Sequence, residues 1–260
     1  MFVGYYFSDK NYRSLYNVIA SIQWMNPRDP QPSSGNELHV SSNVHIINLS
    51  EIVPSRFHCL QTKTLVNRTG AHICLHETKK DVYVSGAYRD TQSVWEEAKV
   101  TRILQYLLRH PRLDFIDVGA NIGAYTMYVA ALGRFVLAID CFAPNMARLR
   151  RSVQLAKVAD HVVLVQNAIY RHSGLQLRLS VDTRNIGGQG ISIVRNHSNA
   201  RLLAGNASRS NPYVVQTILF DEILPILVAR GIRAALMKID IEGSESFVVE
   251  TGGGVFDIKR

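Results

Sequence analysis

Amphipathic stretches and short apolar runs alternate along most of the chain. Over residues 93–108 apolar positions recur with the period of a helix, and Ser93 is a residue type that caps a helix start. Apolar runs of strand length lie at 113–118, 135–139, 162–165 and 234–239, and a further strand is predicted at 175–179. Amphipathic helices are predicted at 124–132 and 143–157. Strands that alternate with helices predict an open α/β sheet.

The first 90 residues are patterned less regularly. We expect a short helix over 12–25, an exposed loop rich in Pro and Ser over 27–35, and strands over 44–49, 64–66, 71–75 and 81–84. His72 and His76 lie four residues apart, but no third ligand follows, so edge-strand histidines are favoured over a metal site. The shift in pattern divides the chain into an N-terminal region, 1–90, and a second domain, 91–260.

Composition narrows the class of protein. Apolar residues make up 47% of the 260 residues and charged residues 19%, which excludes wholesale disorder. The net charge is +8, of which +7 lies in residues 101–260, scattered and without a nucleic-acid motif. We therefore interpret it as surface charge and expect no nucleic-acid partner. No apolar run has the length of a membrane span, and the first residues do not resemble a signal peptide.

Two features concern the cellular compartment. The chain has four Asn-X-Ser/Thr sequons, at Asn48, Asn67, Asn196 and Asn206. Cys59 and Cys74 bracket a turn-like segment, so a hairpin there can join them as a disulfide. Both features slightly favour the lumen of the secretory pathway, such as the Golgi, with a membrane anchor in a longer N-terminus. Two ordinary thiols and chance sequons in a cytoplasmic chain remain the alternative.

The segment from Leu113 to Gly123 carries the first candidate site. An apolar strand ends at Asp117 and enters a turn with Gly119 and Gly123, after which a helix begins. Glycines at such a turn let a ligand approach the backbone, and the helix start offers unpaired N–H groups. Asp140 follows the next strand, at the spacing at which nucleotide-binding units place the carboxylate for the ribose hydroxyls. The combination predicts an adenosine ligand.

The residues of this turn favour one adenosine ligand over another. Dinucleotide folds prefer a glycine where this chain has Asn121, because that glycine makes room for the pyrophosphate. Asp117 would repel a pyrophosphate and suit a cation, so S-adenosylmethionine is favoured over NAD. Asn167, just past the third strand, is placed either to bond the adenine edge or to form an ordinary turn. The glycine-rich loop 185–190 is of a kind that orders over a substrate.

The second candidate site is at the end of the run 234–239. Asp240 and Glu242 follow this buried strand, and period-2 spacing on a strand would turn both the same way. In an open α/β sheet ligands bind beyond the carboxyl ends of the strands. The two acids are candidate catalytic groups that accept a proton from a substrate hydroxyl, hold a divalent cation, or bind the substrate's amine or hydroxyls. The alternative is that Glu242 and Glu245 cap the next helix.

These motifs together resemble the FkbM-type S-adenosylmethionine-dependent methyltransferase family over about residues 93–250. The resemblance is carried by the following segments: Asp117-Val-Gly-Ala-Asn-Ile-Gly123, Asp140, Asn145, Asn167-Ala168 and Lys238-Ile-Asp-Ile-Glu-Gly-Ser-Glu245. Residues 141–145 and 185–190 are more similar to the animal, methyltransferase-like members. Asp140-Cys141 departs from the usual Glu-Pro of the family, and Asp keeps the carboxylate for the ribose.

The resemblance implies a class I methyltransferase fold, which is a Rossmann-like, doubly wound sheet, and transfer of a methyl group, typically to a hydroxyl. It implies cofactor-binding and catalytic roles for the following residues: Asp117, Gly119, Asn121, Gly123, Asp140 and Asn167 for the cofactor, Asp240 and Glu242 beside the methyl group. The family's fold has three further strands after the fourth. We therefore expect a domain that is truncated at its C-terminus after the fourth core strand, with a small β-rich N-terminal extension and an exposed apolar edge on the fourth strand.

Two classes of function follow from these expectations. The first is an S-adenosylmethionine-dependent methyltransferase that methylates a hydroxyl of a carbohydrate or small-molecule acceptor. The second is a non-catalytic binding or scaffold protein on a degenerate or truncated methyltransferase fold. An NAD-dependent oxidoreductase is disfavoured because the dinucleotide glycine pattern is absent.

Overall fold

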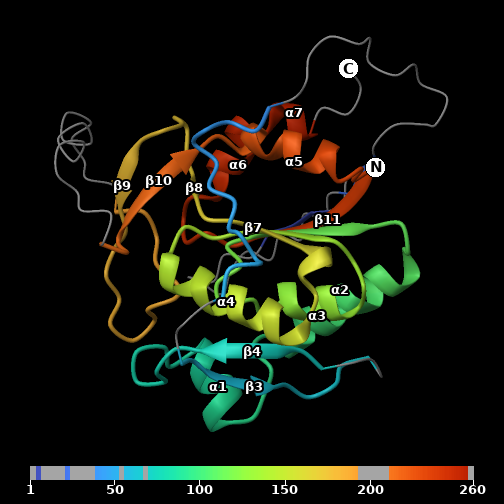
Figure 1. Cartoon of the computed structure of the whole chain (residues 1–260), viewed down its shortest axis with the longest axis vertical. Coiled ribbons are helices and arrows are strands. Elements are labelled where there is room, and N and C mark those ends of the chain that lie inside the picture. Colours follow the sequence, from blue (N-terminus) through green and yellow to red (C-terminus); the bar gives the residue numbers. More distant parts are fainter. Residues whose placement is uncertain are drawn as a thin grey trace.

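A parallel sheet between two layers of helices forms the centre of the protein (Figure 1). The computed structural model describes residues 4–6, 21–23, 39–52, 56–66, 70–192 and 211–256. The four parallel core strands, in spatial order, are β7 (Val162–Val165), β6 (Val136–Ile139), β5 (Asp114–Val118) and β11 (Ala234–Ile239). All four were predicted from the apolar runs, and the mixed α/β architecture is compatible with a Rossmann-like fold.

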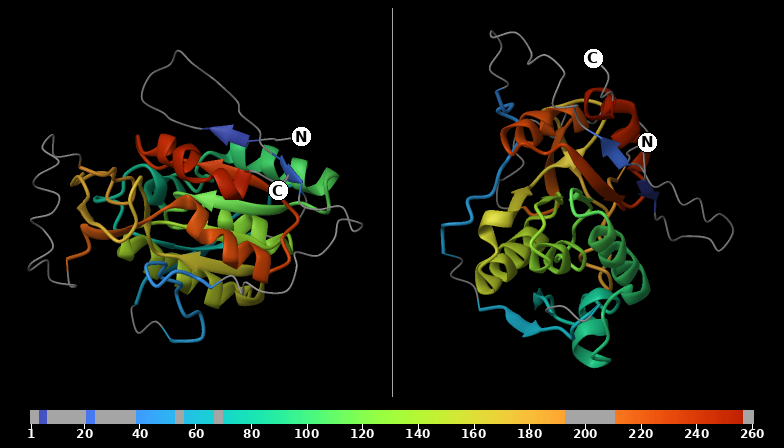
Figure 2. Two further views of the ribbon diagram at one scale, coloured as in Figure 1. Left: turned by 90° about the horizontal axis from the view of Figure 1, so that it is seen from above. Right: turned by 90° about the vertical axis from the view of Figure 1, so that its right-hand side faces the viewer.

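Helices cover both faces of this sheet, and the two further views show the layers from the side (Figure 2). One face carries α2 (Glu97–Arg109), α3 (Thr126–Ala131) and α4 (Ala143–Ala156). The other carries the 3-10 helix η3 (Phe220–Ile223) and the helices α5 (Leu224–Ala229), α6 (Glu245–Thr251) and α7 (Gly253–Phe256). On β5, Phe115 packs against the helix layer of α2, α3 and α4, and its neighbour Ile116 packs against the other helix layer. Both faces of the strands are therefore apolar, which explains the continuous apolar runs.

The edge of β11 is covered, which corrects the expectation of an exposed apolar edge. The strand β1 (Gly4–Tyr6) pairs with it in parallel, with Tyr5 opposite Lys238. The strand β2 (Ser21–Gln23) pairs with it antiparallel, with Ile22 opposite Ala235. Residues 21–23 were predicted to be helical and are a strand, because they take up the unpaired backbone groups of β11. The predicted loop 27–35 lies outside the described residues.

A disulfide-linked hairpin packs beneath α4. The strands β3 (His58–Gln61) and β4 (His72–Leu75) pair antiparallel, with Cys59 opposite Cys74, and a disulfide joins these two residues. The backbone N–H of Cys74 donates to Ser152 Oγ on α4 (3.0 Å). Ile73 of the hairpin belongs to the same apolar cluster as α2 and α4. The hairpin therefore shares a core with the residues beyond position 90.

Several predictions for the N-terminal region are wrong. Residues 44–49 form one isolated bridge, from Ile46 to Val165, in place of the predicted strand. Residues 64–66 follow the strand β3 and do not form a strand themselves. Residues 81–84 lead into the helix α1 (Val84–Asp90), because the Asp81 carboxylate accepts hydrogen bonds from the N–H groups of Val84 (3.3 Å) and Ser85 (2.9 Å). An acceptor at this position satisfies the first turn of a helix.

Details of the second domain also differ from the predictions. The residue before α2 is Glu96, with φ of 51°, so Ser93 does not cap this helix. A small sheet has the order β8 (Ala168–Ile169), β10 (Val214–Ile218) and β9 (Gln176–Arg178), and the 3-10 helix η1 (Ala159–His161) precedes β7. The strand β9 was predicted, whereas β8, β10 and the helix α5 were missed. Within the described ranges no helix is long and apolar enough to cross a membrane.

Candidate functional site

A cleft lies where the four parallel strands end, as is usual for open α/β sheets. Its walls come from the residues that follow β5, β6, β7 and β11, together with the loop 187–191. Six of the eight predicted site residues line it: Gly119, Asn121, Asp140, Asn167, Asp240 and Glu242. Asp117 and Gly123 do not line it. The fold therefore brings most of the predicted residues to one place, although they come from four separate segments.

The two glycines of the first turn are required by packing within the chain. Gly119 has φ of +82°, and a Cβ at this residue would lie 1.8 Å from the backbone oxygen of Asp240. Gly123 has φ of +96°, and its Cβ would lie 2.4 Å from Cδ1 of Leu149 on α4. At Gly119 the clash is with the backbone and excludes a larger residue. At Gly123 the Leu149 side chain would have to move, and the positive φ would strain the larger residue.

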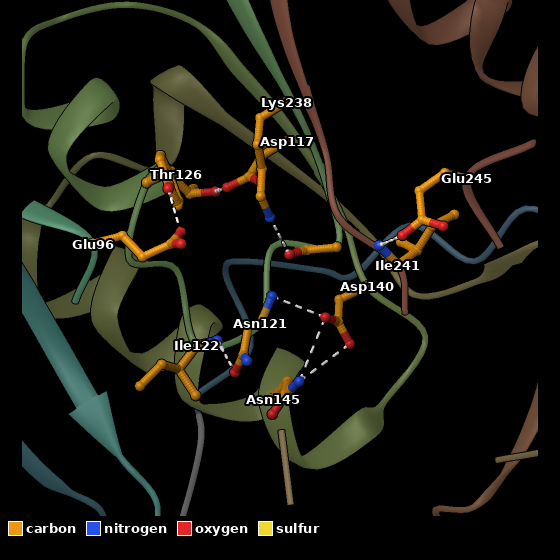
Figure 3. A network of polar contacts seen from close by, with 12 residues as sticks. Glu96, Asp117, Asn121, Ile122, Thr126, Asp140, Asn145, Lys238, Ile241 and Glu245 are labelled. Carbon is orange, nitrogen blue, oxygen red and sulfur yellow. Dashed lines mark hydrogen bonds and ion pairs between the residues drawn. The ribbon is translucent and has the colours of Figure 1, made fainter. Parts of the chain in front are cut away.

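The Asp117 carboxylate is buried beneath the cleft and paired there. Its Oδ1 lies 3.2 Å from Nζ of Lys238, and its Oδ2 accepts a hydrogen bond from Thr126 Oγ1 (2.7 Å). Lys238 Nζ also donates to the backbone oxygen of Gly119 (2.6 Å; Figure 3). Burial alone would lower the pKa of Lys238, and the carboxylates of Asp117 and Asp240 outweigh this effect and raise it. The charge of Asp117 is thus balanced internally, so the argument that it selects a cationic ligand does not hold at this residue.

Asp140 is held at the turn that follows β5. Its Oδ2 accepts from the backbone N–H of Asn121 (2.8 Å; Figure 3), and its Oδ1 accepts from the backbone N–H of Phe142 (2.8 Å). Burial raises the pKa of Asp140 to about 6, and the bonds from Phe142, Asn121 and Asn145 partly oppose the rise. Its two oxygens already accept four hydrogen bonds, two of them long ones from Asn145 Nδ2 (3.4 Å), so a ribose hydroxyl would bind by displacing these long bonds. The Asn121 N–H, which would meet a pyrophosphate in a dinucleotide fold, is used by Asp140.

The loop 187–191 closes over this end of the cleft. Asn145 Nδ2 donates to the backbone oxygen of Gly187 (2.9 Å) and lies 3.4 Å from both carboxylate oxygens of Asp140. Asn145 Oδ1 is bonded to His76 Nε2 (2.8 Å), and burial lowers the pKa of His76 to about 4. His76 therefore lies neutral in the core, after the end of β4, and not at the edge of a strand as predicted. Across the described residues no group of three potential ligands gathers for a metal ion.

The side chain of Asn167 is occupied by structural bonds. Its Oδ1 accepts from the backbone N–H of His45 (2.7 Å), and its Nδ2 donates to the backbone oxygen of Asn43 (3.0 Å) and that of Gln216 (3.3 Å). The side chain fixes the segment 43–45 and β10 against the sheet. Of the two alternatives for Asn167, the geometry favours the structural one over a bond to an adenine edge.

Asp240 and Glu242 lie beyond the end of β11, which stops at Ile239. The period-2 argument for them therefore fails, because Glu242 sits in a turn with φ of 51°. Asp240 is half-buried, and burial raises its pKa more than the neighbouring Lys238 lowers it. Glu242 is exposed at the rim. Glu245 accepts from the N–H groups of Ile241 (3.1 Å) and Gly243 (3.2 Å), so Glu245 is the acid that caps this turn.

Glu96 and Tyr125 line the cleft and were missed as site residues. The Tyr125 hydroxyl donates to Glu96 Oε2 (2.5 Å), and Lys99 pairs with the other carboxylate oxygen. Lys238 Nζ lies 5.3 Å from the centre of the Tyr125 ring. The helical pattern of residues 93–108 made Glu96 an ordinary first-turn acid. Glu96 has a positive φ, as do Asn121 and Glu242 in the same cleft, and this backbone conformation turns its side chain inward. A sequence pattern does not reveal such a conformation.

Comparison with protein family models, with curated proteins and with solved structures finds no match to this chain. The interpretation of the cleft therefore depends on its own chemistry. Four acids, one lysine and several apolar side chains line it, namely Glu96, Asp140, Asp240, Glu242, Lys238 and, among the apolar ones, Ile139. Such a lining suits a ligand that has both polar and apolar parts.

Proposed function

We propose that the chain is an S-adenosylmethionine-dependent methyltransferase of the class I, Rossmann-like type. The observation that carries the proposal is that four acids, Glu96, Asp140, Asp240 and Glu242, line one cleft at the carboxyl ends of the parallel strands, with Asp140 directly after β6 and bonded to the glycine turn. The resemblance of the motifs to the FkbM-type family supports it. The seven-strand architecture of that family and a truncation after β11 are not needed for the proposal.

The residues of the cleft fit the parts of S-adenosylmethionine. Asp140 would bind the ribose hydroxyls, and Ile139 and Phe142 would contact the adenine. Gln189 Oε1 is buried and has no hydrogen-bond partner within the described structure, so it is available to an amino group such as that of adenine. Asp240 and Glu242 would face the cationic methionine portion. Their carboxylates would attract this cation, a role that the paired Asp117 does not fill.

The cofactor, when bound, supplies an electrophilic methyl group, and the protein's part is to position the acceptor and handle its proton. Asp240 Oδ1 or Oδ2 is the candidate proton acceptor for a hydroxyl of the acceptor. A carboxylate is a stronger base when its pKa is raised, and burial raises that of Asp240. Alignment of the two reacting groups contributes to the rate independently of the base. We propose O-methylation of a carbohydrate or small-molecule acceptor.

A second candidate is a non-catalytic binding protein on the same fold. The observation that favours it is that the Asp117 carboxylate is paired with Lys238 and bonded to Thr126, and that the Asn167 side chain is bonded to the backbone of the protein. Such a protein would retain the fold and lack the cofactor. The two candidates thus differ in cofactor binding.

Isothermal titration calorimetry with S-adenosylmethionine and with S-adenosylhomocysteine tests the proposal. The wild type should bind both, and Asp140→Ala should weaken binding at least about tenfold, since a ribose contact to a carboxylate is worth about 1.5–3 kcal/mol. Asp160→Ala, which removes an exposed acid from the opposite edge of the sheet, should bind as the wild type does. Absence of binding by a folded wild type would refute the proposal and favour the second candidate.

A further inference from the structure

Positively charged side chains gather at the amino ends of the parallel strands, on the side of the sheet opposite the cleft. The segments 110–113, 132–135, 157–161 and 230–233 each precede a parallel strand, so they lie at the amino ends of β5, β6, β7 and β11. Together they contain one acid, Asp160, and the following cations: Arg112, Arg134, Lys157, Arg230 and Arg233. Their net charge is therefore +4, half of the +8 of the whole chain, and Arg109 ends the helix before the first segment.

Contacts between the segments show that these cations belong to one surface. Arg134 Nη1 donates to the backbone oxygen of Pro111, which joins the segments before β6 and β5. Arg230 Nη1 lies 3.4 Å from the backbone oxygen of Asp160, which joins the segments before β11 and β7. The Arg230 guanidinium also lies 5.3 Å from the centre of the Phe135 ring. Two of the arginines are thus held in place by neighbouring segments before any ligand arrives.

The described part of the chain compensates this charge only in part, through Asp160 and through Asp114, whose carboxylate accepts from the N–H of Phe135 (3.2 Å) and interacts with Arg134. Arg109, Arg112, Lys157, Arg230 and Arg233 are exposed. The ion pairs between described residues involve other cations, such as Lys63, Lys80 and Arg150. Uncompensated cations at one edge of a protein attract polyanions and raise their rate of association.

We propose that this surface binds a sulfated polysaccharide, away from the cleft. All but one of its cations are arginines, and the planar guanidinium donates two parallel hydrogen bonds to an oxyanion such as a sulfate. The Cys59–Cys74 disulfide favours an oxidising compartment, where sulfated polysaccharides are the abundant polyanions and nucleic acids are not. The four segments expose no large apolar side chain, which a membrane-inserting surface would need.

The surface and the cleft are separate sites. The core strands are four to six residues long, so the two edges of the sheet lie about 13–20 Å apart. The proposal does not depend on the proposed methyltransferase function. If both hold, the surface retains a long anionic chain while the cleft acts on another part of it, or on a different acceptor.

Binding of a size-fractionated heparin oligosaccharide, measured by calorimetry at several salt concentrations, tests the proposal. The triple variant Arg112→Ser, Lys157→Ser, Arg233→Ser removes three exposed cations whose charged groups make no hydrogen bond or ion pair with other described residues. Its affinity near physiological ionic strength, about 0.15 M, should fall at least about tenfold. The slope of log Kd against log salt should fall by about 2 to 3, one counterion for each cation removed.

The matched control removes three exposed cations elsewhere, by Lys79→Ser, Arg178→Ser and Arg184→Ser, and changes the net charge equally. It should bind heparin as the wild type does. Equal loss in the two triple variants would overturn the proposal, because the binding would then follow net charge alone. Failure of the wild type to bind heparin, or tighter binding to phosphatidylserine vesicles or duplex DNA than to heparin, would also overturn it. The triple variant Arg112→Ser, Lys157→Ser, Arg233→Ser should keep its affinity for S-adenosylmethionine and its thermal stability. Loss of either would reveal a folding defect.

Discussion

Removal of the Cys59–Cys74 disulfide should destabilise the protein by an amount that the structure allows us to calculate. The bond closes a hairpin whose second strand rests on α4, through the contact from Cys74 N–H to Ser152 Oγ. Arg148, on the same helix, donates to the backbone oxygen of Leu75 (2.9 Å). The perturbation is Cys59→Ala with Cys74→Ala.

The expected loss comes from the entropy of the unfolded chain. The two cysteines are separated by 15 residues, and a loop of this length corresponds to about 3 kcal/mol at room temperature. For a domain of this size, each kcal/mol shifts the melting temperature by about 2–4 °C. The double variant should therefore melt about 6–12 °C below the wild type. The hairpin is small, so most of the sheet should remain folded.

Thermal unfolding followed by circular dichroism measures this loss, with and without a reducing agent. Reduction should lower the melting temperature of the wild type to that of the double variant and should leave the variant unchanged. Cys141→Ala, which removes the unpaired cysteine, is the control and should respond to reduction as the wild type does. Two free thiols at positions 59 and 74 in the purified wild type, or a melting temperature that reduction leaves unaltered, would refute the reasoning.

Three further predictions concern the cleft and the surface. Because burial raises the pKa of Asp140 to about 6, affinity for S-adenosylmethionine should fall as the pH drops below that value. Calorimetry should find a smaller fall in Asp140→Asn, where Asp240, whose pKa burial also raises, still titrates. Gly119→Ala should unfold far more readily than Gly133→Ala in chemical denaturation. Both have positive φ, but only at Gly119 would the Cβ meet protein, 1.8 Å from the oxygen of Asp240, so equal stability would contradict the clash. In secretory expression the exposed Asn48 should carry a glycan, and Asn48→Gln should lose one endoglycosidase-sensitive mass step.

The four core strands were predictable because each is buried on both faces, which leaves a continuous apolar run in the sequence. The pairing of β1 and β2 with β11 was not predictable, since it joins the start of the chain to a strand near its end. The helix α1 was missed because its start depends on one carboxylate, that of Asp81, folding back onto two N–H groups. Local patterns carry no information on such contacts.

The residues of the candidate site also fall into those that the sequence could predict and those that it could not. Asp140 and Asp240 were predictable because acids at strand ends share one edge of the sheet. The Asp117–Lys238 pair was not, because two residues far apart in sequence meet only after β5 and β11 have paired. The sequence therefore suggested a free charge at Asp117 where the fold has a neutralised one. Glu96 was missed because its backbone conformation, and not its place in the helical pattern, directs it into the cleft.

The dependence of Asp117 on Lys238 has a consequence for the order of folding during synthesis. The ribosome releases β5, β6 and β7 long before β11, and until then the Asp117 carboxylate would be buried without its cation. An unpaired buried charge is strongly unfavourable, so the nascent three-strand intermediate should stay loosely packed around β5. Arrival of β11 supplies the ammonium and the last inner strand together. The glycine turn should therefore take its final conformation in one late, cooperative step, after most of the chain has emerged.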